Sequence, residues 1–492
     1  MSSISFRALL LAALSGPIAL AACAPVPQLG ARPEVRAGDT FVADRSIAAA
    51  QTASAAWPAG DWWSLYADPQ LSALIEEGLR DAPDLAAAGA RLRSAQAYVQ
   101  QARGALLPSA GASAGVALNK QSYNNGIPPA FVPHGWNDTG NLGANLDFDL
   151  DLWGKNRAAA RAAVSQAEAA RLELEQARLA LSTNIASAYA DLARLAAERR
   201  VQSRALEVRE QTRKLVADRV KTGLDTRAEL KQADAAVPAA RADLAATDEA
   251  IGLTRNRIAA LLGKGPDRGL DIALPGAPTA TRAVPASATT DLIGRRPDIA
   301  AARARVEAAA QQIKVARADF YPSINLSAMV GLQALYLQNL FKGTSTTGQV
   351  GPAISLPLFR GGELAGRYKG ARAGYDEAVA NYDGIVANAF REVADAVTSR
   401  NALATRLAES RAALADSEQA YAIARQRYQG GLSTFLNVLT AEERVLTARQ
   451  IVADLEARAF TLDVALVRAL GGGFSTNTAS TDTDATKDPN HG

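Results

Sequence analysis

Few side chains in this sequence could carry catalytic chemistry. Its 492 residues include one cysteine, Cys23, and two histidines, His134 and His491. Ser-His-Asp or Cys-His catalysis needs a histidine beside the nucleophile, and zinc sites need several histidine or cysteine ligands. The sequence has no glycine-rich phosphate-binding loop, and a formal net charge of +3 gives no electrostatic case for a nucleic-acid partner. We therefore predict that the chain is not an enzyme, with no catalytic residue, no metal site and no cofactor.

The cysteine stands at the end of an export signal. Arg7 precedes an apolar run that continues to Leu20, and small residues then lead to Cys23. This order is typical of a secretory signal peptide, and the run is shorter than the about 20 apolar residues of a transmembrane helix. The segment resembles a lipobox, which predicts a signal peptide at 1–22 and acyl and diacylglycerol chains on Cys23. Ala24 is not the aspartate of an inner-membrane retention signal, so the anchor points to the outer membrane. Ordinary cleavage that leaves a free thiol is the alternative.

The chain contains one large unit twice. Pro83-Asp84-Leu85 recurs as Pro297-Asp298-Ile299, and the Arg-x-x-x-Gly-Leu-x-Thr pattern that begins at Arg219 recurs at Arg427. Such self-similarity predicts an internal duplication. We expect a lipidated linker at 23–56, repeats at 57–282 and 283–471, and a Ser/Thr/Asp-rich disordered tail at 472–492.

Each repeat should contribute two strands. In about 142–150 and 323–333, apolar side chains fall on every second position, which is the period of a strand with one apolar and one polar face. Weaker strands are expected at about 109–118 and 349–358. A soluble sandwich gives the same alternation, but strands of roughly ten residues also fit a membrane barrel with lipid outside and a polar lumen.

The remaining segments favour very long helices. About 154–220 has no proline and no internal glycine, and about 363–428 is its counterpart in the second repeat. At about 1.5 Å per residue such a helix is roughly 100 Å long. An apolar seven-residue step from Val386 to Tyr428, interrupted by Arg400, indicates supercoiled packing against neighbouring helices. Shorter helices at about 226–262 and 434–470 return from the Gly-Leu turns, and Thr226 with Glu229 has the spacing of a capping box.

One copy of this architecture is incomplete. Four strands cannot close a barrel, because even small transmembrane barrels have about eight. Three chains would supply twelve strands that continue into a ring of long helices. The expected fold is therefore mostly α with a membrane β-barrel, built as a trimer of duplicated helical-hairpin chains.

Ordered motifs carry a resemblance to a known family over about 57–470. They are Trp62-Trp63-x-x-Tyr66-x-Asp68-Pro69-x-Leu71, Leu107-Pro108, Asp151-Leu152-Trp153-Gly154-Lys155, Arg295-Arg296-Pro297-Asp298-Ile299, Phe320-Tyr321-Pro322 and Pro357-Leu358-Phe359-Arg360-Gly361-Gly362. In these the chain resembles the outer-membrane efflux proteins, in the TolC/OprM/NodT-like lipoprotein branch. The resemblance implies a homotrimer with a twelve-stranded barrel in the outer membrane and a long periplasmic α-barrel. It also implies a passive exit duct that receives substrates from a periplasmic adaptor and an inner-membrane pump.

The same resemblance implies two sites. The hairpin tips, which would contact the adaptor, are Gly223, Leu224, Asp225 and Thr226 in the first repeat and Gly431, Leu432, Ser433 and Thr434 in the second. We expect glycine to end one helix at each tip and threonine to cap the next.

The second site is a periplasmic gate. Where the family has a leucine and, four residues later, an aspartate, this chain has Leu436 and Thr440. Leu436 on its own is equally compatible with an ordinary coiled-coil core residue. Thr440 departs from the pattern and argues against a charged gate, although Glu442 or Glu443 could face the pore instead.

Two other protein classes have long helices. A periplasmic adaptor would carry one hairpin per chain and soluble β-domains, and a structural coiled-coil lipoprotein would need no alternating strands. Drugs, metal ions and polypeptides are all compatible as the transported substrate.

Overall fold

A computed structural model describes residues 25–37, 40–41, 43–47, 51–52, 55–276, 283–285 and 287–475. The expected signal peptide at 1–22, Cys23 and residues 476–492 of the expected tail lie outside the described residues. The chain divides into two compact units. One contains the segment up to Val35 with Leu92–Ala169 and Ala302–Asn381, and the other contains Arg36–Arg91, Ala170–Ala301 and the chain from Tyr382 onward.

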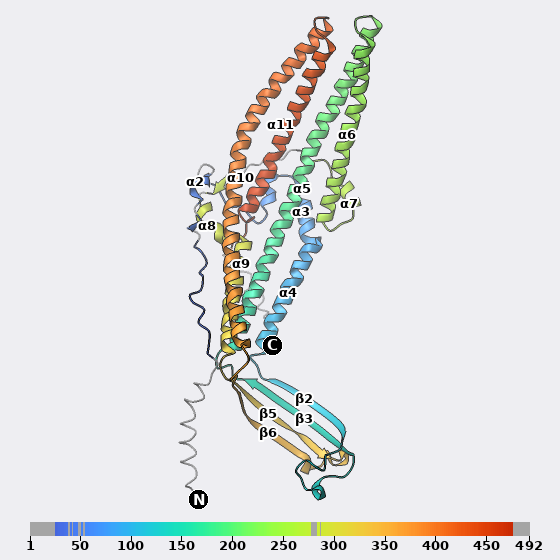
Figure 1. The fold of residues 1–492 in the computed structure, drawn as a ribbon. Coiled ribbons are helices and arrows are strands. Elements are labelled where there is room, and N and C mark those ends of the chain that lie inside the picture. The colour runs from blue at the N-terminus through green and yellow to red at the C-terminus, as the bar shows by residue number, and fades with distance from the viewer. Residues whose placement is uncertain are drawn as a thin grey trace, which may run out of the picture. The chain divides into compact units, whose positions relative to one another are not determined.

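The first unit holds a four-stranded antiparallel sheet in the order β2-β3-β5-β6 (Figure 1). Its strands are β2 (Ser109–Asn119), β3 (Asn137–Asp149), β5 (Ser323–Leu335) and β6 (Thr346–Ser355). The central pair, β3 and β5, joins the two repeats. β3 begins earlier than the expected residue 142 because Asn137 to Asn141 pair with β2. Cross-strand pairing, which a sequence window does not contain, extends the strand into this polar segment.

The sheet has one apolar and one polar face. Every pairing in its register joins two even-numbered or two odd-numbered residues, as in Leu142 with Leu332 and Asn141 with Gln333, so even-numbered residues share one face. Large exposed side chains gather on the even-numbered face: Val116, Leu118, Leu142, Leu146, Leu326, Val330, Val350 and Ile354. Asn, Ser and Asp residues such as Asn141, Asp147 and Asn325 lie on the other face. The alternation expected from the sequence is therefore present on one continuous surface.

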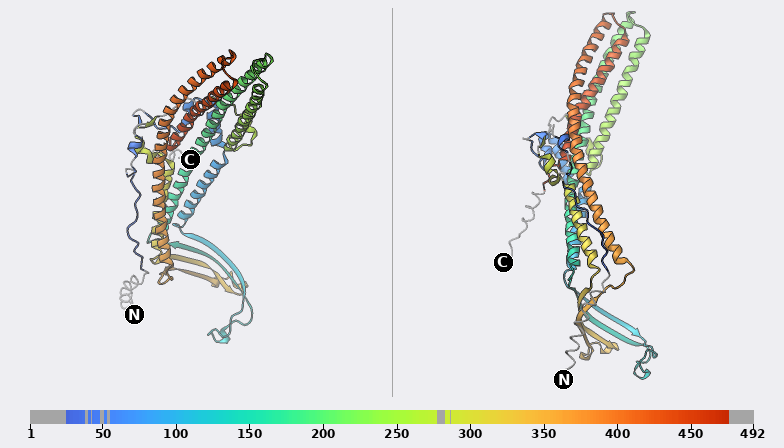
Figure 2. Two further views of the ribbon diagram at one scale, coloured as in Figure 1. Left: turned by 45° about the horizontal axis from the view of Figure 1, so that its top comes forward. Right: turned by 60° about the vertical axis from the view of Figure 1, so that its left-hand side comes forward.

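The helices repeat with equal lengths. α5 (Lys155–Lys221) and α10 (Glu363–Gln429) each have 67 residues, and α6 (Arg227–Leu261) and α11 (Phe435–Ala469) each have 35. The helices that precede the strands, α4 (Pro83–Gly104) and α9 (Pro297–Ala318), each have 22. α6 returns along α5 and α11 along α10, each pair closed by one turn (Figure 2). The structure therefore contains the duplication inferred from the motifs.

Short elements complete the two units. In the second unit they are α2 (Asp44–Ile47), η3 (Trp62–Tyr66), α3 (Pro69–Asp81), α7 (Asp267–Leu270), α8 (Ala288–Arg295) and the parallel pair β1 (Gln51–Thr52) and β4 (Val284–Pro285). In the first unit η4 (Pro129–Phe131), η5 (Leu337–Asn339) and η6 (Gly343–Ser345) lie in the loops between strands. Among the helices of the described residues, none is both long and apolar enough to span a membrane.

The aromatic motif before α3 belongs to the core of the second unit. Trp62 and Tyr66 are buried against α5, α6 and α11 side chains that include Tyr189 and Phe460. Asp68 caps α3 by accepting from the N–H groups of Gln70 and Leu71 at 2.9 and 3.1 Å, and Pro69 occupies the first helical position. An aspartate cap with a following proline starts a helix at a fixed point. This segment therefore orders the core on which the long helices rest.

Hairpin tips as the candidate functional site

Both hairpin tips have the same left-handed turn. Gly223 and Gly431 have φ values of +75° and +73°. At the first tip the N–H of Gly223 donates to Val220 at 3.1 Å and that of Leu224 to Arg219 at 2.9 Å. The second tip repeats this pair of bonds from Gly431 and Leu432, at 3.0 and 2.7 Å. These are the two hydrogen bonds of a Schellman motif, in which glycine avoids the strain that a Cβ would create.

The two tips differ in how the return helix starts. Thr226 accepts from the N–H of Ala228 at 3.1 Å, and the Glu229 carboxylate accepts from the N–H of Thr226 at 2.9 Å. The expected capping box is therefore present at the first tip. Thr434 makes no side-chain cap. The expectation of a threonine cap at the second tip is wrong, and Asn437 stands there in place of the glutamate that completes a capping box.

Asp225 turns inward and joins the two hairpins. Its carboxylate accepts from Arg219 Nε at 3.0 Å and from the hydroxyl of Tyr428, and both charged side chains are largely buried. The Arg219 guanidinium lies 4.5 Å from the Tyr428 ring centre and donates to the carbonyl of Gln429. Burial and the bond to Asp225 raise the pKa of Tyr428, so its hydroxyl remains a donor at neutral pH. The side chain of Asp225 is therefore not available for contact with another protein.

Two leucines are the prominent outward side chains of the tips. Leu224 is 65% exposed and Leu432 is 72% exposed, whereas the hydroxyl oxygen of Ser433 is buried. Directly beneath them, Val216, Tyr428 and Phe435 form part of a small apolar cluster. The arrangement presents an apolar side chain on a rigid turn at each tip, supported from below.

The expected gate residues lie in the first two turns of α11. Leu436 is 63% exposed, and the Thr440 hydroxyl donates to the carbonyl of Leu436 at 3.0 Å. Phe435 and Val438 are buried on the other side of this helix. Leu436 is therefore not a core residue of a single chain. The hydroxyl of Thr440 is occupied within its own helix.

The acids near this position have different environments. Glu442 is buried and contacts Arg209 of α5, with 3.3 Å between Oε1 and Nε. Glu443 is exposed. Of the two acids expected as alternatives to the gate aspartate, Glu442 therefore points between the helices of its own chain, and Glu443 is the one that faces outward.

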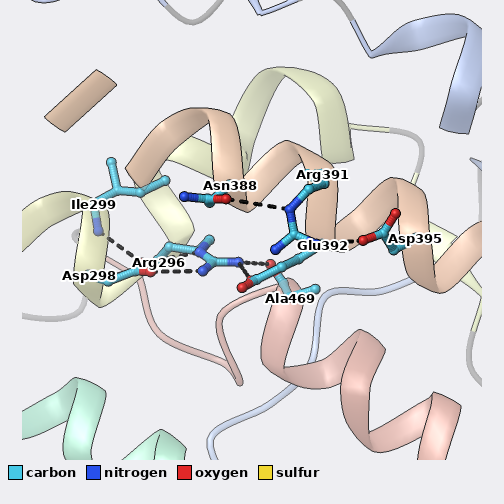
Figure 3. Close-up of polar contacts among 8 residues, drawn as sticks. All are labelled: Arg296, Asp298, Ile299, Asn388, Arg391, Glu392, Asp395 and Ala469. Carbon is cyan, nitrogen blue, oxygen red and sulfur yellow. Dashed lines mark hydrogen bonds and ion pairs between the residues drawn. The ribbon is translucent and has the colours of Figure 1, made fainter. Parts of the chain in front are cut away.

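The Arg-Arg-Pro-Asp-Ile motif forms a network that sequence reasoning missed (Figure 3). Buried Arg296 donates to both carboxylate oxygens of Asp298, at 3.1 and 2.7 Å. It also donates to Glu392 of α10 at 2.7 Å and to the carbonyl of Ala469 at the end of α11 at 2.9 Å. One guanidinium thus ties the start of α9 to both helices of the second hairpin. The first repeat has Ala82 at the position equivalent to Arg296. This difference between the two repeats is the sequence signal that could have indicated the network.

Nothing in the described chain resembles a catalytic or metal centre. No group of three or more His, Cys, Asp and Glu residues among the described residues is arranged to hold a metal. His134 lies in the loop between β2 and β3, where its ring packs against Tyr123 with 5.3 Å between ring centres. The arrangement offers exposed apolar side chains on fixed turns in place of reactive groups.

Comparison with known proteins gives consistent matches. The family described as Outer membrane efflux protein matches residues 74–264 and 289–472. Fusaric acid resistance protein FusA of Burkholderia cepacia is 36% identical over 377 residues, which cover 74% of this chain and 69% of that protein. Multidrug resistance outer membrane protein MdtP of Shigella flexneri is 34% identical over 341 residues, which cover 65% of this chain and 67% of that protein.

Solved structures match over most of the chain. The outer membrane protein VceC of Vibrio cholerae has 46% sequence identity and a TM-score of 0.79, and the match covers 85% of this chain and all of VceC. The outer-membrane channel OprN has 27% identity and a TM-score of 0.79, with 92% of this chain and 99% of OprN covered. The duplicated helices, the four-stranded sheet and these matches together show that the chain belongs to the outer membrane efflux protein family and is an outer-membrane channel of an efflux system.

Proposed function

We propose that the chain acts as a lipid-anchored, homotrimeric exit duct. It would receive substrates from an inner-membrane pump through a periplasmic adaptor and conduct them passively across the outer membrane. Cys23 would carry the lipid, the tips would contact the adaptor, and Leu436 would form the constriction. The transported substrate and the identity of the pump follow from none of these residues.

The sheet of the first unit carries this proposal. Its even-numbered face is apolar and exposed, which suits contact with lipid, and its other face is polar, which suits an aqueous lumen. Its outer strands β2 and β6 have 11 and 10 residues and are each paired on one side only. Unpaired strand edges cannot be left in lipid, because each free backbone group costs several kcal/mol there. Pairing β6 of one copy with β2 of the next satisfies both edges, and three copies supply twelve strands.

Aromatic side chains flank the strands as they do in membrane barrels. Trp136 directly precedes β3, and Trp153 follows its end after three residues, 150–152. Tyr321 precedes β5 and stacks on Trp153 with 4.8 Å between ring centres. Aromatic girdles at both interfaces are typical of outer-membrane strands. These positions support a membrane-spanning segment that coincides with the sheet.

The tips support the adaptor contact. Each presents an exposed leucine, Leu224 or Leu432, on a glycine turn whose shape is fixed by two hydrogen bonds. A turn of fixed shape can present such a side chain to a partner with little loss of conformational freedom on binding. The relatives named for resistance to fusaric acid and to multiple drugs make small toxic compounds the first substrates to test.

The experiment is to delete the gene and measure growth across a panel of toxic compounds, with complementation by wild type and by the tip variants described in the Discussion. Restored resistance by the wild type supports the efflux role. Equal sensitivity of the deletion strain and its parent to every compound in the panel, in a strain with no second channel of this family, would contradict it.

A further inference from the structure

A buried ion pair joins the two hairpins close to the expected constriction. Glu442 of α11 contacts Arg209 of α5, with 3.3 Å between Oε1 and Nε, and its side chain is 5% exposed. Arg209 also donates to the carbonyl of Ala236 on α6, at 3.4 Å. The pair therefore links α11 to both helices of the other hairpin, less than two turns of helix from Leu436.

The surroundings of Glu442 compensate its charge poorly. Its second carboxylate oxygen, Oε2, is buried and has no hydrogen-bond partner within the part of the chain that the structure describes. The charged and titratable groups that face it are Arg209 from α5, Tyr421 from α10 and Glu443 from its own helix. The positive charges of Arg425 and Arg449 lower the pKa of Tyr421. The charges that influence the Glu442 carboxylate are those of Arg209 and Glu443. One cation at 3.3 Å is thus the only close opposite charge among the described residues.

The energetics of such a pair are unfavourable to ionisation. Removing a carboxylate from water costs several kcal/mol, and attraction to one partner offsets this only when all its oxygen atoms are hydrogen-bonded. Here one oxygen is not. Burial accordingly raises the pKa of Glu442, although Arg209 acts in the opposite direction.

We propose that Glu442, with Arg209, is a positioning residue that sets the balance between the packed and separated hairpins and hence between the closed and open entrance. Ionised Glu442 favours separation because separation returns its charge to water, and neutral Glu442 favours packing. This inference rests on the proposed channel function. It adds a protonation-dependent control that acts inside each chain and does not need a ring of charges in the pore.

The direction of the pH effect follows from linkage. A carboxyl group that is protonated more readily in the packed state than in the open state makes packing take up protons. Lowering the pH therefore favours the packed, closed entrance, and raising the pH favours opening. For one carboxyl the ratio of open to closed states can change at most about tenfold per pH unit, and three copies that open together steepen this.

The test is single-channel recording of purified trimers in planar bilayers between about pH 5 and pH 8. Wild-type channels should open more often as the pH rises. At every pH, the Glu442→Gln channel should show the low open probability that the wild-type channel shows at acid pH. Arg209→Met should open more than wild type at the upper end, because the buried carboxylate then has no cation. The double variant R209M/E442M should be closed and insensitive to pH.

The matched control is Glu456→Gln. Glu456 is also an acid of α11, but it is 43% exposed and pairs with Arg411 of the same hairpin at 2.6 Å. Its replacement should leave the pH profile unchanged. If Glu442→Gln fails to assemble, Glu442→Asp tests the same point, since a shorter carboxylate lies farther from Arg209 and should shift the profile without abolishing it.

Several results would overturn the inference. They are a wild-type profile that is flat, a profile of opposite sign, or a profile that Glu442→Gln or Glu442→Asp leaves unchanged. In each of these cases trimers still conduct, so the proposed function stands. Wild-type protein that forms neither trimers nor conducting channels would contradict the proposed function itself.

Discussion

The tips allow a substitution that separates backbone shape from side-chain bulk. Gly223 and Gly431 both have φ near +75°, and a Cβ added at either position meets no atom within 4 Å. The Cβ of a substituted residue therefore meets no clash, and the expected cost comes from the left-handed backbone. That cost is about 1–2 kcal/mol per residue for ordinary side chains and is smaller for asparagine, which tolerates this region.

We expect the double substitution of Gly223 and Gly431 by valine to destabilise each tip by at least about 1–2 kcal/mol, enough to reshape the turn. The buried cluster of Val216, Tyr428 and Phe435 beneath the tips is untouched, so the trimer should still form and conduct. Efflux should be lost, because the turn that presents Leu224 and Leu432 changes. The double asparagine variant places a similar side chain on the same surface but keeps the turn, and should retain most resistance.

The assay combines three measurements on the same strains: resistance to the toxic compounds, trimer content of the outer membrane, and conductance of the purified channel. Unchanged resistance in the double valine variant would refute the claim that the turn shape matters for docking. Loss of resistance in both the valine and the asparagine variants would refute the backbone explanation and assign the effect to bulk at the surface.

Other changes have distinct expected results. Arg296→Met should lower the free energy of unfolding by about 3–5 kcal/mol, because it leaves two acids and a helix-end carbonyl without their buried partner, and guanidinium titration measures this. Arg303→Met, which removes an arginine that is 71% exposed in an i,i+4 pair, should cost less than about 1 kcal/mol; equal losses would contradict the assigned role of the network. Leu436→Ser should raise single-channel conductance and admit large antibiotics from outside, since apolar rings can close a pore by dewetting; unaltered conductance would remove Leu436 from the constriction. Thr440→Ala should leave the conductance nearly unchanged, because the Thr440 hydroxyl is bonded within its own helix. Thr440→Asp should introduce block by multivalent cations added from the periplasmic side. Strong cation block already present in the wild type would reveal another acid in the pore. Cys23→Ser should abolish labelling by fatty acids such as palmitate yet leave the sheet inserted, because the strands supply most of the apolar burial; a wild type that takes up no label would refute the lipid anchor.

Local sequence patterns were sufficient to predict the helices and strands, but they were insufficient to predict the contacts between these elements. Period-two alternation located the strands, and the absence of proline and internal glycine located α5, because these patterns depend on neighbouring residues. α10 was predicted as the counterpart of α5 in the second repeat, although it contains four glycines. The seven-residue step was also informative: Val386, Val393 and Tyr428 are buried in the seam that it predicts.

The contacts within the site depend on residues far apart in the chain. Asp225 pairs with Tyr428 and Arg209 with Glu442 across more than 200 positions. A threonine after a tight turn indicates a cap, but Thr434 makes none, and no glutamate follows three residues later to complete a capping box. No single-sequence pattern encodes which hairpin side chains meet.

The central claim is that three copies of this chain close one membrane channel. The most direct measurement is native mass spectrometry of the protein extracted from outer membranes, followed by bilayer recording of the same sample. The account predicts a mass of three chains, each with its lipid, and discrete conductance steps from that species alone. A monomeric protein, or a trimer that gives no conductance steps under any pH or voltage tested, would contradict it.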